Sequence, residues 1–444
     1  MRISGSMVMG LLLPLVIQTT LSNEGDPRQG LSTATANSSP GRMKLSEALS
    51  LALERNPDLA LSAEEIRALD GRIRQAGLKP NPEISAETEN IAGTGEMGWV
   101  HSAETTFQIA IPIEAGTKRR HRVQNAVWEK EQAIKESRVH RAEVIVATAE
   151  AFIELLASQQ RLENRHELSI LAEKIDQTVA GRVSAGKVSP IEASRSQVAL
   201  QTARLEEEKA NRALAAAKDH LASFWQGSGA EIGSAQGSFR LPSSAVVSHQ
   251  AKMGVKGNPQ MEEEEMRIEV QKSRAAYEVI SAKPNILLTA GFRRLSPLGS
   301  SAMVAGVSIP LPLFDRRQGA AEEAQHRVEK ARLERAALEN RLLALLRRQQ
   351  QTAETAFLEA TAISDSLLPG AQDALDHLEE GYRQGKFEFL PVLDAQRTYA
   401  ELKGRYIDAI AAAVKAVIGI QHLNGSADAP AALDYLIRGE GNGS

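Results

Sequence analysis

The chain contains the same succession of short motifs twice, about 200 residues apart, and this duplication constrains its fold more than any other feature. Asn-Pro pairs at 56–57 and 258–259 are followed by Lys-Pro-Asn at 79–81 and 283–285. Each copy then has an Ile-Pro segment and a Gly-Lys turn, at 186–187 and 385–386. Because all four landmarks keep their order and nearly their spacing, the 444 residues are interpreted as two copies of one structural unit.

The segments around these copies define the expected domain organisation. We expect a first structural repeat at 43–230, a linker at 231–250 and a second structural repeat at 251–425. Arg2 followed by an apolar run from Met7 to Ile17 is typical of a signal peptide, assigned to 1–22, and this run is too short to span a bilayer as a helix. Residues 23–42, rich in Ser, Thr, Gly and Asn, are predicted to be a linker, and 426–444 a C-terminal tail.

Each unit is predicted to contain a helix after Asn-Pro, followed by two strands. Apolar residues alternate with small or polar ones in "TTFQIAI" (105–111), "NILLTAGFRR" (285–294) and "AGVSIPL" (305–311), and 82–92 shows the pattern less clearly. This period of two gives one apolar face. A soluble sheet shows the same alternation, but segments of ~9–11 residues also have the length of a membrane-barrel strand.

Long helices follow the strands. Between Gly319 and Gly370 the chain has no glycine, and its apolar residues step by three and four. The predicted seam consists of Ala321, Ala324, Val328, Ala331, Leu338, Leu342 and Leu345, and in the first unit of Ile145, Ala149, Phe152 and Leu156. Helices at 190–224 and 391–423 return after the Gly-Lys turns, so each turn is predicted to be the tip of a helical hairpin, at the end away from the strands.

Other chemistry finds no support in the sequence. There is no cysteine, which excludes disulfides and thiolate ligands, and no two of the nine histidines lie within four residues of each other. We find no phosphate-binding loop and no arrangement typical of a catalytic triad, and the net charge of −4 gives no indication of nucleic-acid binding. We therefore expect no enzyme activity, no cofactor, no metal site and no nucleic-acid partner.

These elements predict a mainly α fold with a small β part. Four strands cannot close a membrane barrel alone, because unpaired backbone groups in hydrocarbon cost several kcal/mol each. Three copies would supply twelve strands, an even number within the known range. The expected fold is internally duplicated long helical hairpins forming an α-barrel, plus four strands per chain contributing to a trimeric transmembrane β-barrel.

With its duplicated strand-pair and long-helix order and the tip "GYRQGKFEFLPVLDAQ" (381–396), the chain resembles the TolC-like outer-membrane factors. Residues 113–119 (IEAGTKR) are similar to the IELGGKR segment of the CzcC-like, heavy-metal efflux branch at five of seven positions. The resemblance implies a homotrimer in outer-membrane lipid with its helices in the periplasm. It also implies a periplasmic membrane-fusion adaptor and an inner-membrane RND pump as partners.

The resemblance also assigns roles at the tips. Tyr382 corresponds to a tyrosine that helps hold the tip closed, and Asp394 to an acid lining the narrow entrance. A second acid expected near Asp394 is replaced by Pro391. Glycine, lysine and apolar residues at the tips are expected to contact the adaptor, with Val188, Phe387 and Phe389 exposed at an end that has little core, or else only to close the hairpins. The residues concerned are Gly186, Lys187, Val188, Gly385, Lys386, Phe387 and Phe389.

The function expected from the sequence is a passive outer-membrane exit duct in a tripartite efflux system, with divalent heavy-metal cations as cargo. Two alternatives stay open at this point. One is a duct of the same family for drugs or other small molecules. The other is a soluble periplasmic coiled-coil adaptor or scaffold, which would have no need of four apolar-alternating strands.

Overall fold

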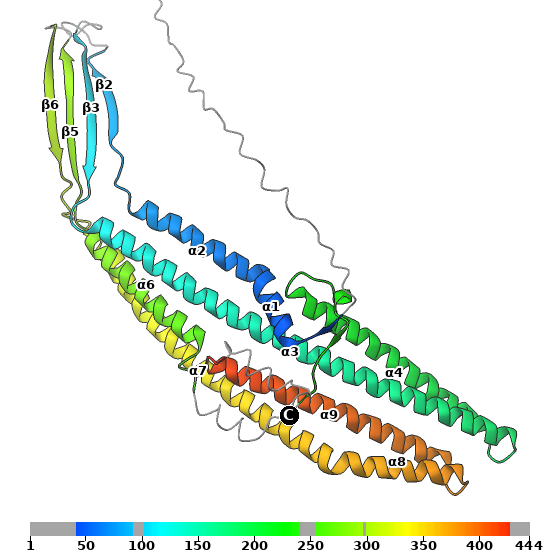
Figure 1. The fold of residues 1–444 in the computed structure, drawn as a ribbon. Helices are drawn as coiled ribbons and strands as arrows, with labels where there is room; N and C mark the ends of the chain where they lie inside the picture. Colours follow the sequence, from blue (N-terminus) through cyan, green and yellow to red (C-terminus); the bar gives the residue numbers. More distant parts are fainter. Residues whose placement is uncertain (1–40, 92–101, 240, 242–253, 296–298, 427–444) are drawn as a thin grey trace, which may run out of the picture. The chain divides into compact units, whose positions relative to one another are not determined.

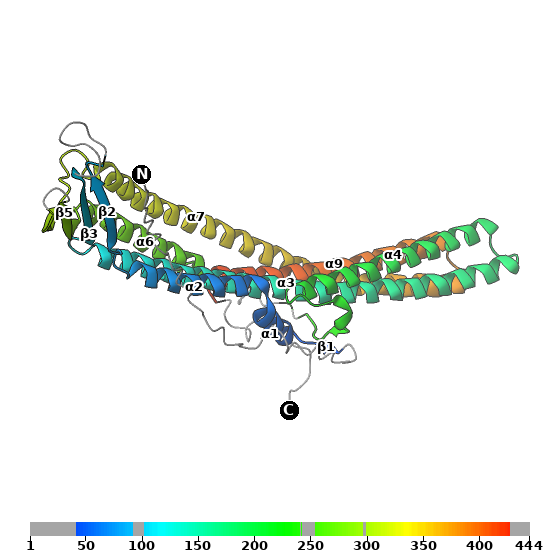
Figure 2. The ribbon, with the colours of Figure 1, turned by 90° about the horizontal axis from the view of Figure 1, so that it is seen from above.

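The computed structural model describes residues 41–91, 102–239, 241, 254–295 and 299–426. The expected signal peptide, most of the linker at 23–42, the strand loop at 93–98 and nearly all of the C-terminal tail lie outside the described residues. Within the described part, long helices run from a four-stranded sheet towards two helical tips (Figure 1). Figure 2 shows the same arrangement after a quarter turn, with the sheet and the tips again at opposite ends.

The two repeats have the same order of elements from the Asn-Pro helix onward, except that the long helix is continuous in the first repeat and divided in two in the second. The first contains α1 (Leu45–Arg55), α2 (Pro57–Ala76), β2 (Glu83–Glu89), β3 (Glu104–Ile113), α3 (Lys118–Ser184) and α4 (Pro190–Ser223). The second contains α6 (Pro259–Ser281), β5 (Ile286–Leu295), β6 (Ser300–Ser308), α7 (Gln318–Ala362), α8 (Leu368–Arg383) and α9 (Phe389–Leu423). The predicted succession of helix, strand pair, long helix, tip and returning helix is therefore confirmed.

The repeated Asn-Pro pairs have a structural role in both copies. Asn56 and Asn258 are the N-caps of α2 and α6, and each side-chain oxygen accepts a hydrogen bond from the backbone amide two residues later. The following proline occupies the first helical position, where no backbone donor is needed. The Asn56 amide donates to the carbonyl oxygen of Phe224, and Asn258 donates to those of His422 and Leu423. The motif thus joins the start of one helix to the end of the returning helix of its own repeat.

The main sheet has the order β2-β3-β5-β6, and every neighbouring pair is antiparallel. β3 and β5 come from different repeats, and their register pairs Phe107 with Phe292 and Ile109 with Ala290. The rings of Phe107 and Phe292 stack with centroids 5.3 Å apart. On this face the apolar side chains are exposed, including Ile84, Ile111 and Met303. Residues 309–311, predicted to continue the last strand, lie beyond the end of β6.

A second, small sheet was not predicted. β1 (Arg42–Met43) pairs in parallel with β4 (Ser234–Ala235), which follows the 3-10 turn η3 (Gly229–Glu231). Ile232 and Ala235 are buried, and the Gln159 side chain on α3 makes hydrogen bonds with the backbone of Ala235 in both directions. The start of the segment assigned to the inter-repeat linker at 231–250 therefore packs against the helices.

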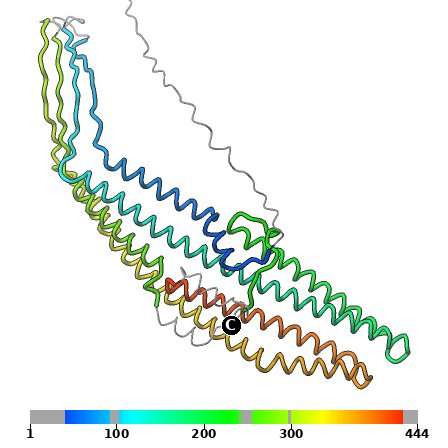
Figure 3. The backbone as a smooth tube through the Cα atoms, viewed as in Figure 1, coloured from blue at the N-terminus to red at the C-terminus, as the bar shows by residue number. Residues whose placement is uncertain are grey.

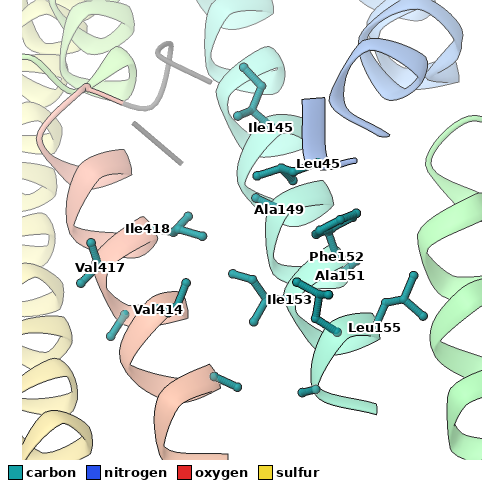
Figure 4. Close-up of a cluster of buried hydrophobic side chains, with 14 of the residues drawn as sticks. Leu45, Ile145, Ala149, Ala151, Phe152, Ile153, Leu155, Val414, Val417 and Ile418 are labelled. Carbon is teal, nitrogen blue, oxygen red and sulfur yellow. The ribbon is translucent and has the colours of Figure 1, made fainter. Parts of the chain in front are cut away.

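The main apolar core lies where α1, α3 and α9 meet (Figure 4). Leu45, Phe152 and Ile418 are among its fully buried side chains. The predicted seam in the first repeat is confirmed, since all four of its residues are buried in this core. α9 is long and apolar enough to span a membrane by length and composition, but its apolar residues are largely buried among the helices, as in a core helix.

The seam of the second repeat is correct only in part. Ala324, Val328, Ala331 and Leu342 are buried, but Leu345 is 45% exposed and Leu346 takes the buried position. The step after Leu342 is four residues rather than three, which keeps the seam turned towards its neighbours on a helix of 3.6 residues per turn. The long helix also contains a π-helical turn, Ile363–Leu367, just before Pro369.

Candidate channel entrance at the hairpin tips

Both tips are built from the same backbone motif. Gly186 and Gly385 have φ values of +68° and +78°, a conformation that a residue with a side chain adopts only with strain. Their amides donate to the carbonyl oxygens of Val183 and Tyr382, and the following lysine amides donate to residues 182 and 381. This pairing is the Schellman motif that ends α-helices. The tube in Figure 3 places both turns at the end away from the strands, as the Gly-Lys spacing predicts.

The two hairpins contact each other through Tyr382 at the end of α8. Arg182, on α3, donates from Nη1 to the carbonyl oxygen of Tyr382 at 2.6 Å, and its guanidinium carbon lies 4.4 Å from the centroid of the tyrosine ring. The Tyr382 hydroxyl donates to Oε2 of Glu192, on α4, over 3.4 Å. Tyr382 therefore joins its own hairpin to both helices of the other one.

A small apolar cluster supports these polar contacts. It contains Ile175 and Val179 of α3, Tyr382 of α8, and Phe389 and Val392 of α9. The rings of Tyr382 and Phe389 are tilted, with centroids 5.7 Å apart, an arrangement worth about 0.5–1.5 kcal/mol beyond burial. Because the cluster draws on both hairpins, it holds the tips together as one unit.

The expected exposure of the tip residues is only partly correct. Phe387 is 49% exposed and Lys187, Lys386 and both tip glycines are also exposed, but Phe389 is only 2% exposed. Phe389 is the first residue of α9, and at that position its side chain packs back into the cluster around Tyr382. Val188 is half-buried. The expectation of an exposed apolar Phe389 was therefore wrong.

Asp394 is exposed, on the first turns of α9. Aligning the two tip glycines, which are 199 residues apart, places Arg195 of α4 at the equivalent position of the first repeat, and Arg195 is exposed too. The chain thus presents one acid and one base at matching positions behind its two tips. Tyr382 and Asp394 are brought to the same hairpin, one buried and one exposed.

The partners of Tyr382 were not predicted from the sequence. Arg182 and Glu192 flank the first Gly-Lys turn, at the end of α3 and the start of α4. The usable signal was a difference between the copies: a basic residue stands at 182, where the alignment of the tips places Gly381. Gly381 packs under the ring of Phe387, where an added Cβ would clash.

Burial raises the pKa of two groups near the tips. Burial raises the pKa of Tyr382, with Arg182 acting in the opposite direction. Burial also raises the pKa of Glu379 on α8, although the side chain of Gln396 acts in the opposite direction. A neutral phenol at Tyr382 can therefore act as donor to Glu192 throughout the physiological pH range.

Charged pairs join the two hairpins further along the helices. Glu154 on α3 accepts from Lys415 of α9 at 2.5 Å and from Arg161 at 2.7 Å. Burial works against its ionisation, but these two bonds prevail and lower the pKa of Glu154. Arg161 also pairs with Asp408 on α9 at 2.8 Å. Among the described residues, no group of three or more His, Asp or Glu side chains is placed to hold a metal ion.

An open sheet with an exposed apolar face, carried on duplicated helical hairpins, defines a subunit of a membrane channel. The chain belongs to the outer membrane efflux protein family, whose model matches residues 48–226 and 255–426. The predicted TolC-like, CzcC-like resemblance is thereby confirmed. The protein is placed in the outer membrane with its helical part in the periplasm, and the family works with periplasmic adaptors and inner-membrane pumps.

Individual relatives agree with this assignment. The cobalt-zinc-cadmium resistance protein CzcC of Cupriavidus metallidurans is 28% identical over 87% of this chain and 90% of its own. The nickel-cobalt-cadmium resistance protein NccC of Alcaligenes xylosoxydans xylosoxydans is 24% identical over 69% of each chain. The fold is similar to that of CusC, with a TM-score of 0.69, 16% identity and coverage of 86% of this chain and 92% of CusC. VceC of Vibrio cholerae has a TM-score of 0.71 at 18% identity, over 86% of this chain and 96% of VceC.

Proposed function

We propose that this chain forms a homotrimeric, passive exit duct for divalent heavy-metal cations in a tripartite efflux system. The cargo is inferred from the relatives CzcC and NccC, which are named for resistance to cobalt, zinc, cadmium and nickel. The residues at the entrance suit weak, repeated contacts with passing ions rather than tight binding. A duct needs no reacting group, so we expect no enzymatic activity.

The proposal that the chain forms a duct is supported above all by the two free edges of the sheet. Within the described residues β2 and β6 each pair on one side only, and the antiparallel order makes these two strands run in opposite directions. The β6 edge of one copy can therefore pair with the β2 edge of the next in the same antiparallel sense. Three copies close a barrel of twelve strands without leaving unpaired backbone groups in lipid.

The tips are proposed to form the periplasmic entrance. Threefold symmetry would bring three copies of Asp394 into one ring, which raises the local concentration of cations. The contacts of Tyr382 with Arg182 and Glu192 would hold the hairpins in the narrow arrangement. Opening would break these contacts, so the tip is the part expected to move.

The exposed tip residues are proposed to bind the periplasmic adaptor. Phe387 is a large exposed ring that follows the exposed Lys386 in the sequence, and the exposed Lys187 occupies the equivalent place at the tip of the other hairpin. An apolar side chain at the end of a helical hairpin fits the groove between the helices of a partner. Gly186 and Gly385 set the turns that present these side chains, and the inner-membrane RND pump would be reached through the adaptor.

Growth of a deletion strain tests the cargo. We expect lower tolerance of zinc, cobalt, cadmium or nickel, restored by the gene on a plasmid, and unchanged tolerance of drugs and dyes. Unchanged tolerance of all these metals together with new drug sensitivity would contradict a metal cargo and favour a drug duct of the same family. A complementing plasmid that carries a frameshift is the matched control.

A further inference from the structure

The four connections between strands and helices lie together at one end of the helices (Figure 1). Many cations occur in and beside these connections. Five of these cations are exposed and form no ion pair among the described residues; we call them the junction collar. They are Lys79, Arg119, Arg120, Lys283 and Arg316. Each lies within eight residues of a strand end. Exposed cations without carboxylate partners are available to an anionic surface.

Other cations at the junction are already used within the chain. Arg122 is paired with Glu114 at 2.6 Å, and Arg317 with Glu278 at 2.6 Å. Lys118 donates to Oδ1 of Asn285, just before β5, at 2.8 Å. These contacts fix the backbone of both repeats at the junction, so the unpaired cations are held on a structured support.

The two repeats converge at this position. The carbon stem of Lys283, which precedes β5, lies against Gly116, which precedes α3. Burial lowers the pKa of Lys118, which Glu114 opposes and the nearby Arg317 lowers further. Basic residues that are distant in sequence therefore form one surface rather than two separate runs.

An apolar segment joins this surface to the exposed face of the sheet. Val307 of β6 lies on the same face as Phe107 and Phe292. Every second residue after it is also apolar, namely Ile309 and Leu311. Large apolar side chains remain exposed along 309–314, up to Phe314 at 90%. They end at Phe314, two residues before Arg316; the exposed Asp315 between them accepts a hydrogen bond from the backbone amide of Arg317. Apolar groups followed by cations match the order of acyl chains and phosphates at a bilayer surface.

We propose that the junction collar binds the phosphate groups of anionic phospholipids in the periplasm-facing leaflet, with Leu313 and Phe314 inserted among the acyl chains. The inference rests on the position of the sheet in the outer membrane but not on the cargo. Each Lys or Arg near an anionic membrane surface raises the affinity for that surface roughly fivefold. The collar would thus fix how deeply the sheet is inserted and hold the helices at the membrane surface.

Lipid retention tests this directly. The purified full chain in detergent is mixed with equal amounts of dioctanoyl phosphatidylglycerol and dioctanoyl phosphatidylcholine, and native mass spectrometry counts the lipids retained. We expect preferential retention of phosphatidylglycerol, which Arg119→Gln, Arg120→Gln and Arg316→Gln combined reduce by roughly tenfold or more. The matched control combines Arg67→Gln, Arg212→Gln and Arg397→Gln, which remove the same charge from exposed helix positions and should keep the preference.

Several results would overturn the proposal. Equal retention of both lipids by the unaltered chain would do so, as would an unchanged preference in the triple variant. So would a triple variant that loses subunit assembly but keeps the lipid preference, because the collar would then be a subunit contact. Complete displacement of phosphatidylglycerol by millimolar inorganic phosphate would point to a site for free anions and would also exclude a lipid surface.

Two further readouts separate this inference from the proposed cargo. In the unaltered chain the preference should fall as salt is raised, because exposed charges are screened, and this requires no variant that must fold. A chain that prefers phosphatidylglycerol without conferring metal tolerance would overturn only the proposal of a metal cargo. A chain that confers metal tolerance while retaining both lipids equally would overturn only the collar.

Discussion

The guanidinium of Arg182 covers the ring of Tyr382 at 4.4 Å and donates a hydrogen bond of 2.6 Å to the carbonyl oxygen of the same residue. The two residues lie on α3 and α8, the outgoing helices of the two hairpins. A single side chain thus links the repeats at the end where the entrance is proposed. The contact would have to break if the hairpins moved apart.

Arg182→Gln is expected to loosen the entrance. It removes the cation over the ring and a charge-assisted hydrogen bond, together worth about 1–2 kcal/mol at this half-buried position. The conductance of the purified channel in planar bilayers should rise, and cells should become more sensitive to large antibiotics. Arg212→Gln, which removes an exposed charge on α4, is the matched control. Equal conductance of the Arg182 variant and the unaltered channel would show that this contact does not restrict the entrance.

Two substitutions of Tyr382 should separate the contribution of its hydroxyl to stability from that of its ring. Tyr382→Phe removes only the 3.4 Å contact with Glu192 and should lower the free energy of unfolding by less than about 1 kcal/mol. Tyr382→Ala also removes the buried ring from the tip cluster, which costs about 3–5 kcal/mol. Thermal unfolding followed by circular dichroism measures both. Equal losses for the two variants would assign the role to the hydroxyl and contradict the packing described for the ring.

Phe389 and Phe387 should behave differently despite their proximity in sequence. Phe389→Ala leaves a cavity beside Tyr382 and should cost about 3–5 kcal/mol of stability. Phe387→Ala affects a half-exposed ring and should cost much less, while weakening adaptor binding measured by pull-down or surface plasmon resonance. An unstable Phe387 variant with normal adaptor binding would contradict the assignment of the exposed ring to docking.

The lowered pKa of His422 predicts that the protein loses stability in mild acid. Burial lowers its pKa from 6.5, Glu143 opposes this shift, and the buried Nδ1 has no hydrogen-bond partner in the part of the chain that the structure describes. The unfolded chain binds a proton at His422 more readily than the folded chain does. The stability contributed by burying the neutral imidazole is therefore fully present above pH 6.5 and is lost as pH falls towards the folded pKa. His422→Gln should make the melting temperature depend less on pH between pH 7 and pH 5; His121→Gln, at a half-buried position of α3, is the matched control. An unchanged pH profile in the His422 variant would show that another group titrates.

The sequence predicted the repeats, the strands and the tips because each rests on local chemistry. Asn-Pro fixes a helix start, Gly-Lys a helix end, and period-two apolar residues a strand, so these features can be read without knowing their neighbours. The register of β3 on β5 and the small β1–β4 sheet depend on contacts between distant residues. Neither has a local pattern, and neither was predicted.

The candidate entrance shows the same limit at the level of single residues. Family resemblance selected Tyr382 and Asp394, but the partners Arg182 and Glu192 depend on how the first hairpin packs against the second. Phe389 was expected to be exposed because it lies in a turn rich in apolar residues. It is buried because it begins α9, and this position turns its ring towards Ile175 and Val179.

The central claim is that strands from three chains complete one membrane barrel. Native mass spectrometry of the protein purified from outer membranes in detergent measures this most directly. We expect a folded species of three chains, which falls apart when the sheet is unfolded by heating. A folded single chain that stays in solution without detergent, with Phe107 and Phe292 protected from water-borne labels, would contradict the account.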